Sequence, residues 1–300
     1  MGRMSVKIAG VELKNPVMTA SGTFGSGQEF GEILDLERLG AVVTKGVSLK
    51  PWEGNPVPRI AETPSGMLNA IGLQNPGIET FLARDLPRLG GKNVRTVVNV
   101  CGHTVEEYCE VVSRLADQPV DLLEINVSCP NVTSGGIAFG LDPQALARVT
   151  REVKREARQP VIMKLSPNVT DIALMAKTAE AEGADAVSLI NTLLGMKIDI
   201  RRRAFALANR TGGLSGPAIR PVAVRMVYQA AHAVSIPVIG MGGISTGEDA
   251  IEFLMAGASA VCVGTSSFHD PFSAVRIVDE IDAFLESEGI RDIREIIGIV

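Results

Sequence analysis

Eight short apolar runs alternate with longer amphipathic segments along the 300-residue chain, and this repeat restricts the fold more than any other feature. The runs are continuously apolar, which is typical of parallel strands whose outer side is covered by helices. We expect strands at residues 16–20, 41–45, 96–100, 122–127, 161–165, 186–191, 237–240 and 260–263. Eight strand–helix units predict an α/β fold, a (β/α)8 TIM barrel, with residues 1–300 as a single domain.

The segments between the runs carry helix and turn signals. We expect helices at residues 104–116, 143–157, 171–182, 217–233 and 248–256, with N-caps at Thr104, Asp142, Thr170 and Thr246. Residues 6–13, with a turn at Ala9–Gly10, predict a small N-terminal hairpin at the bottom of the barrel. The Pro- and Gly-rich segment 48–77 is the most loop-like part, and we expect such inserted loops at the C-terminal face.

An open doubly wound sheet is the alternative arrangement of such units. It is disfavoured because no Gly-x-Gly-x-x-Gly sequence follows a strand, leads into a helix and has an acidic residue about 20 positions later.

Composition and charge argue against several classes of function. The 29 basic and 34 acidic residues form no block of either sign, which argues against nucleic-acid binding. No apolar run reaches the roughly 18 to 20 residues of a membrane span, and residues 1–9 lack a signal-peptide core, so we expect a cytoplasmic protein without a membrane contact. The four cysteines have neither CxxC nor metal-ligand spacing, which predicts no metal site and free thiols.

Polar residues follow almost every predicted strand at its carboxyl end, where barrels build their active sites. They are Ser21, Lys45, Asn99, Asn126, Lys164, Asn191 and Thr192. A single asparagine there often bonds to loop backbone, but several buried lysines and amides without partners would cost a few kcal/mol each. Because amides offer both donors and acceptors, this rim predicts binding of a planar ligand with alternating C=O and N–H groups.

Glycines follow the last two predicted strands. Gly242–Gly243 and Gly264–Thr265 would let backbone N–H groups approach an anion closely, at the position where barrels bind phosphate. The sequence therefore predicts a phosphate site at this corner.

Cys129 is the candidate for proton or nucleophilic chemistry. It lies in the sequence Asn-Val-Ser-Cys-Pro-Asn at 126–131, among polar neighbours, and the glycine-containing segment 133–140 could act as a lid. Its thiolate could serve as nucleophile or general base. We expect Cys101, Cys109 and Cys262 to pack as small hydrophobes, and we assign no catalytic role to His103, His232 or His269.

Several motifs occur together and in order: Ala-Ser-Gly-Thr-Phe-Gly at 20–25, Thr-Lys-Gly at 44–46, Asn-Ala-Ile-Gly-Leu-Gln-Asn at 69–75, the motif at 126–131, Lys164, Ile-Asn-Thr at 190–192, Gly-Leu-Ser-Gly at 213–216 and Gly-Met-Gly-Gly-Ile at 240–244. Over nearly the whole chain they resemble dihydroorotate dehydrogenases. With a cysteine in the 126–131 motif, the chain resembles the soluble class 1 enzymes. Class 2 enzymes carry a serine base instead and have a membrane-binding extension. The motifs at 20–25 and 69–75 resemble class 1B, the NAD-linked form, more than the fumarate-linked class 1A.

The resemblance implies an FMN enzyme that oxidises (S)-dihydroorotate to orotate in pyrimidine (UMP) biosynthesis. Cys129 would remove the C5 proton while a hydride leaves C6 for the flavin. Cofactor-binding residues would be Ser21, Lys45, Gly46, Asn99, Asn126, Lys164, Ile190, Gly216, Gly242, Gly243, Gly264 and Thr265. Substrate-binding residues would be Lys45, Asn69, Ala70, Ile71, Gly72, Leu73, Asn126, Asn131, Asn191 and Thr192.

The resemblance to class 1B also implies a partner subunit that carries FAD and a 2Fe–2S cluster and reduces NAD, with a homodimer of this chain at the core of a heterotetramer. Four alternatives remain open: a class 1A enzyme, a dihydropyrimidine dehydrogenase-like FMN barrel, a flavin-free barrel isomerase or lyase that handles phosphates, and a non-catalytic binding barrel.

Overall fold

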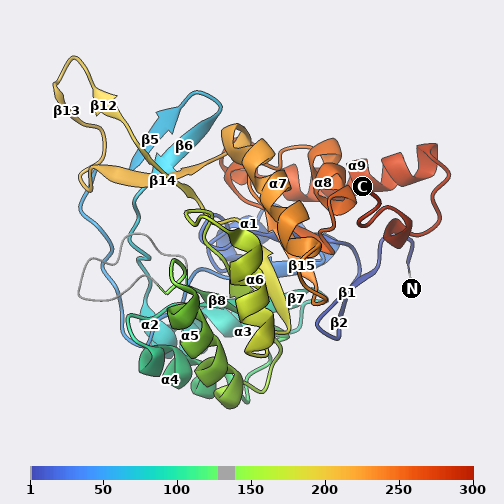
Figure 1. The fold of residues 1–300 in the computed structure, drawn as a ribbon, viewed down its shortest axis with the longest axis horizontal. Coiled ribbons are helices and arrows are strands. Elements are labelled where there is room, and N and C mark those ends of the chain that lie inside the picture. Colours follow the sequence, from blue (N-terminus) through green and yellow to red (C-terminus); the bar gives the residue numbers. More distant parts are fainter. Residues whose placement is uncertain (1, 128–138) are drawn as a thin grey trace.

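Eight parallel strands close into a barrel in a computed structural model that describes residues 2–127 and 139–300 (Figure 1). They follow one another around the barrel in chain order, and β16 pairs with β3 to close it. The strands are β3 (Val17–Thr19), β4 (Ala41–Val43), β7 (Arg95–Val100), β8 (Leu122–Asn126), β9 (Val161–Lys164), β10 (Ala186–Leu189), β15 (Val238–Met241) and β16 (Ala260–Val263). The predicted (β/α)8 fold and its eight strands are confirmed.

The longer helices lie outside the barrel, and each buries one face. In α4, for example, the buried Tyr108, Val111 and Leu115 recur at helical spacing. The longer helices are α4 (Val105–Leu115), α5 (Pro143–Glu156), α6 (Ile172–Ala181), α7 (Arg220–Ala231), α8 (Gly247–Met255) and α9 (Ser273–Ser287). The shorter turns are α1 (Gln28–Gly31), η1 (Leu36–Arg38), α2 (Gly77–Thr80), η2 (Phe81–Asp85), α3 (Leu86–Leu89), η3 (Pro217–Ile219), η4 (Thr265–Phe268) and η5 (Ile293–Glu295).

Three of the four predicted N-caps are confirmed: Thr104, Asp142 and Thr246 each accept a hydrogen bond from the first turn of their helix. The prediction of Thr170 was wrong. Asp171 caps α6 instead, because its extended backbone lets the carboxylate accept from the Leu174 N–H at 3.0 Å.

A second sheet stands over one end of the barrel, where Figure 1 shows β5, β6 and β14 side by side. It consists of β11 (Leu193–Met196), β14 (Thr211–Ser215), β6 (Gly66–Asn69) and β5 (Ile60–Thr63), and a further hairpin joins β12 (Ile198–Asp199) to β13 (Ala204–Phe205). The segment 48–77 is therefore not merely a loop, since it contributes β5 and β6. Similarly, the helix expected at 217–233 begins with the 3-10 turn η3 and continues as α7.

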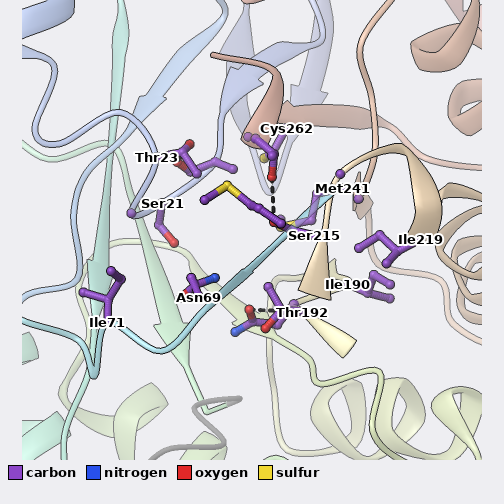
Figure 2. Close-up of a pocket in the computed structure, with 18 of the residues that line it drawn as sticks. Ser21, Thr23, Asn69, Ile71, Ile190, Thr192, Ser215, Ile219, Met241 and Cys262 are labelled. Carbon is purple, nitrogen blue, oxygen red and sulfur yellow. Dashed lines mark hydrogen bonds between the residues drawn. The ribbon is translucent and has the colours of Figure 1, made fainter. Parts of the chain in front are cut away.

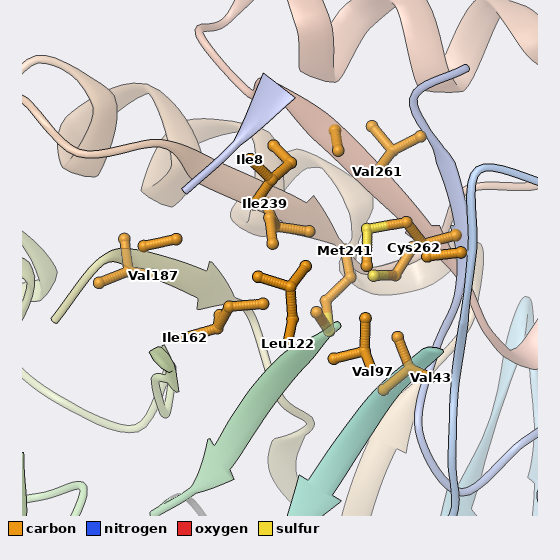
Figure 3. Packing of buried hydrophobic residues seen from close by; sticks show 14 of the residues in the cluster. Ile8, Val43, Val97, Leu122, Ile162, Val187, Ile239, Met241, Val261 and Cys262 are labelled. Atoms are coloured by element: carbon orange, nitrogen blue, oxygen red, sulfur yellow. The ribbon is translucent and has the colours of Figure 1, made fainter. Parts of the chain in front are cut away.

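The main core fills the barrel and the space beneath the helices. Figure 3 shows Val97, Leu122, Ile162 and Ile239 from four strands meeting in it. The predicted N-terminal hairpin is present as β1 (Val6–Ile8) and β2 (Val11–Leu13), and Ile8 is fully buried in the same cluster. Within the described residues, no helix combines the length and apolarity needed to cross a membrane.

Candidate functional site

A cavity of about 250 Å³ lies at the carboxyl ends of the barrel strands and extends beneath the second sheet. Figure 2 shows Ser21, Asn69 and Thr192 reaching it from three different segments. The predicted site residues that line it are Ser21, Lys45, Gly46, Asn69, Ile71, Gly72, Leu73, Asn99, Asn126, Lys164, Ile190, Asn191, Thr192, Gly216, Gly242, Gly243, Gly264 and Thr265. The structure thus brings together residues that are up to 244 positions apart, from Ser21 to Thr265.

Three predicted site residues are not placed at this cavity. Ala70 is fully buried and packs with Leu68 and Leu207 in a small separate cluster, so its side chain faces away. Cys129 and Asn131 lie outside the described residues, as does most of the expected lid.

The floor of the cavity is charged and deeply buried. Lys164 is 4% exposed, donates a hydrogen bond to Ser21 Oγ at 3.0 Å, and has its Nζ 3.6 Å from Glu124 Oε2. Glu124 also accepts from Asn99 Nδ2 at 2.6 Å and from Ser188 Oγ at 2.8 Å. A buried ammonium therefore faces the cavity with its counter-charge directly behind it.

Asn99 presents an unsatisfied acceptor to this floor. Its Nδ2 is committed to Glu124, while Oδ1 is buried and has no hydrogen-bond partner in the described part of the chain. A buried polar atom without a partner costs free energy, so this oxygen fits a ligand that supplies an N–H or O–H donor.

Gly242 and Gly243 form a tight turn after β15. Both have positive φ, +127° and +81°, and a Cβ on Gly243 would lie 2.8 Å from the Gly216 carbonyl oxygen. A side chain at Gly243 would therefore clash as well as strain the backbone. Close by, Thr265 Oγ1 donates to Ser215 Oγ at 2.8 Å, which ties η4 to β14.

The inserted sheet carries Asn69 above the floor. Asn69 and Gly213 are paired in the ladder of β6 and β14, and a Cβ on Gly213 would lie 2.0 Å from Thr192 Oγ1, so only glycine allows this approach. Asn168 fixes the same corner, since its Nδ2 donates to the Thr192 carbonyl at 3.1 Å and its Oδ1 accepts from the Leu194 N–H at 2.9 Å.

Sequence reasoning missed the residues that support the site. Glu124 lies inside an apolar strand, and that charge among Leu122, Leu123 and Ile125 was the available signal. Asn168 gave only a turn signal, and Ser215 lies in a segment where no strand was predicted.

The described cysteines include one at the cavity. Cys262 lines it, and burial raises the pKa of its thiol far above the ordinary value, an effect that the Glu124 charge increases and Lys164 opposes. Burial also raises the pKa of Cys109 on α4. Both are free thiols that remain protonated at neutral pH. In the described part of the chain, no group of three or more His, Cys, Asp or Glu residues could hold a metal ion.

Residues 3–285 match the model of the family described as dihydroorotate dehydrogenase. The chain belongs to this family. It is 63% identical over 296 residues to dihydroorotate dehydrogenase B (NAD(+)), catalytic subunit, of Lachnoclostridium phytofermentans, which covers 99% of both chains. It is 60% identical to the protein of the same name from Alkaliphilus metalliredigens, with 98% of each chain covered.

The fold is also similar to a solved dihydroorotate dehydrogenase structure. The crystal structure of the Eimeria tenella enzyme in complex with ferulenol has a TM-score of 0.82 and 25% identity, and the match covers 99% of this chain and 88% of that one. The overall fold is therefore retained in the family at 25% sequence identity.

Proposed function

We propose that this protein catalyses the FMN-dependent oxidation of (S)-dihydroorotate to orotate in pyrimidine (UMP) biosynthesis, as an NAD-linked dihydroorotate dehydrogenase. The observation that carries this proposal is one cavity in which Lys164, an unsatisfied Asn99 acceptor and two glycine-containing loops meet Asn69 of the inserted sheet. The names of the relatives agree with it, and they favour the NAD-linked form over the fumarate-linked class 1A.

The residues present fit FMN. Gly242, Gly243, Gly264 and Thr265 would hold its phosphate through backbone N–H groups, and the Asn99 oxygen would accept a hydrogen bond from its ring. Lys164 would place a positive charge beside the ring. Ser21, Lys45, Gly46, Asn126, Ile190 and Gly216 would complete its surroundings. When bound, FMN supplies an acceptor for the hydride that leaves C6 of the substrate.

The remaining polar groups suit the substrate. Asn69, Asn126, Asn191 and Thr192 offer donors and acceptors for the pyrimidine ring and its carboxylate, with Lys45 as the positive charge. We assign substrate contacts also to Asn131 and to Ile71, Gly72 and Leu73, of which the last three line the cavity. We assign the removal of the C5 proton to Cys129. A C5 proton next to a carbonyl is acidic enough for a thiolate base.

The electron acceptor requires a partner. The relatives are named catalytic subunits of an NAD(+) enzyme. We infer that this chain passes electrons to a separate subunit with FAD and a 2Fe–2S cluster, and that a homodimer of the chain forms the core of a heterotetramer. The cytoplasm is the proposed location, and the free thiols Cys109 and Cys262 suit its reducing conditions.

The proposal is tested with the purified chain. We expect one FMN per chain after denaturation, and rapid bleaching of the bound flavin by (S)-dihydroorotate but not by dihydrouracil, which lacks the carboxylate. NAD reduction should occur only after the partner subunit is added. Failure to bind FMN even after reconstitution would refute the proposal, bleaching by dihydrouracil would indicate a dihydropyrimidine dehydrogenase, and rapid fumarate reduction would indicate class 1A.

A further inference from the structure

A buried carboxylate lies directly behind the cavity floor. Glu124 in β8 is 2% exposed and contacts two residues of the cavity lining, Asn99 and Lys164. Its Oε2 accepts from Asn99 Nδ2 at 2.6 Å and lies 3.6 Å from Lys164 Nζ, while Oε1 accepts from Ser188 Oγ at 2.8 Å. Both carboxylate oxygens are therefore used, and the negative charge is held in one place.

Strand register brings these groups together. Asn99 is paired with Glu124 across β7 and β8, and Ser188 is paired with Lys164 across β9 and β10. Alternate residues of a strand share a face, so Glu124 and Leu122 lie on the same face of β8. Leu122 packs near Ile162 in the apolar interior (Figure 3). Glu124 thus lies between the apolar interior and the cavity, where charge interactions are strong.

Glu124 determines which atom Asn99 offers to a ligand. An ionised carboxylate accepts hydrogen bonds and cannot donate them, so it binds the Asn99 amide nitrogen. The amide oxygen is then the atom left buried without a partner in the described structure. Without the carboxylate, the Asn99 amide could turn over and offer a donor instead.

Glu124 also limits the positive charge that a ligand meets. Removing one partner of a buried ion pair leaves the other uncompensated. With Glu124 in place, Lys164 acts on the cavity as one half of a pair, and without it Lys164 would act as a full positive charge. Because a reduced flavin carries negative charge, an uncompensated Lys164 would stabilise the reduced form of the cofactor and raise its reduction potential.

We propose, on the basis of the proposed FMN function, that Glu124 is a positioning residue that orients Asn99 and Lys164 and lowers the affinity of the bound flavin for electrons. This setting suits an enzyme that must pass its electrons on to another carrier.

The test measures the reduction potential of the FMN-loaded chain and its affinity for sulfite, an anion that binds flavin more tightly where the surroundings are positive. Glu124→Gln keeps the shape and removes the charge. Ser188→Ala removes a hydrogen bond to Glu124 and keeps the charge, and Glu124→Asp retains the charge on a shorter side chain. We expect Glu124→Gln to favour flavin reduction about tenfold, about 30 mV for a two-electron couple, and to tighten sulfite binding by a similar factor.

Ser188→Ala and Glu124→Asp should change both quantities less than threefold. If Glu124→Gln binds FMN but leaves potential and sulfite affinity within twofold of the parent, or if Ser188→Ala shifts them equally, the proposal is wrong. If Glu124→Gln does not fold, a tenfold shift in Glu124→Asp contradicts it as well. Absence of FMN from the parent chain would instead refute the proposed function.

Discussion

Individual cysteines in this chain differ in what their surroundings allow. Cys262 lines the cavity, yet burial raises its pKa so far that almost no thiolate is present near neutral pH to accept a proton. Cys109 is half-buried on α4, and burial raises its pKa too. Cys101 is fully buried and is not part of the cavity lining. Cys129 lies in a polar sequence directly after β8, which leaves it as the thiol with a suitable place in the chain for proton transfer.

Replacement of Cys129 by alanine should affect chemistry and leave folding intact. We expect flavin reduction by dihydroorotate to slow by about 10² to 10⁴, which is typical of the loss of one positioned acid–base group. In the parent the rate should rise with pH, because the thiolate is the active form and an ordinary thiol has a pKa of about 8.5. Stopped-flow absorbance measures both effects. Cys109→Ala is the matched control and should keep the parent rate, and an alanine variant at 129 with the parent rate and pH profile would exclude Cys129 as the base.

The residue types at strand ends predicted much of the cavity lining, but they did not predict the side chains that hold the lining residues in place. Lys164, Asn99 and Asn191 could be expected at one rim because parallel strands end at the same edge of a barrel. The partner of each side chain could not be predicted, because the contact of Glu124 with Lys164 depends on how neighbouring strands are aligned.

At the level of elements, local periodicity was sufficient for the barrel strands and for five of the six longer helices, whereas α9 was not predicted. The inserted sheet was not predictable in this way, because β6 finds its partner β14 far along the chain, with Asn69 and Gly213 separated by 144 positions. Its short strands alternate weakly and contain several glycines, so their pairing depends on the barrel beneath them.

The start of α8 offers a test of how much one cap contributes. Thr246 Oγ1 accepts from the Asp249 N–H at 3.2 Å, and the Asp249 carboxylate accepts from the Thr246 N–H at 3.1 Å. Thr246→Ala should lower the free energy of unfolding by about 1 kcal/mol, as measured by urea denaturation. Thr178→Ala, inside α6, is the control and should stay within about 0.5 kcal/mol, because alanine favours a helix interior. An equal loss of unfolding free energy in the two variants would show that the Thr246 cap stabilises the protein no more than a threonine inside a helix.

The cavity connects parts of the molecule that are distant in sequence. Its lining includes the loop after β3 at Ser21 and the loop after β16 at Gly264, and these are the two strands whose pairing closes the barrel. A ligand that fills the cavity would therefore contact the loops after both β3 and β16. Its binding would oppose separation of these two strands.

Ligand binding should accordingly stabilise the whole chain as one unit. At 100 times its dissociation constant, FMN is expected to add about 2.7 kcal/mol to the free energy of unfolding, which corresponds to roughly 5 °C in thermal unfolding followed by circular dichroism. Riboflavin has the same ring without the phosphate and should stabilise less at equal concentration, because the backbone N–H groups of Gly243 and Gly264 then lack their anion. If residues 1–300 are one domain, unfolding occurs in a single transition that moves as a whole with FMN. Two transitions, of which FMN shifts only one, would contradict the single domain, and equal stabilisation by riboflavin would contradict the phosphate site.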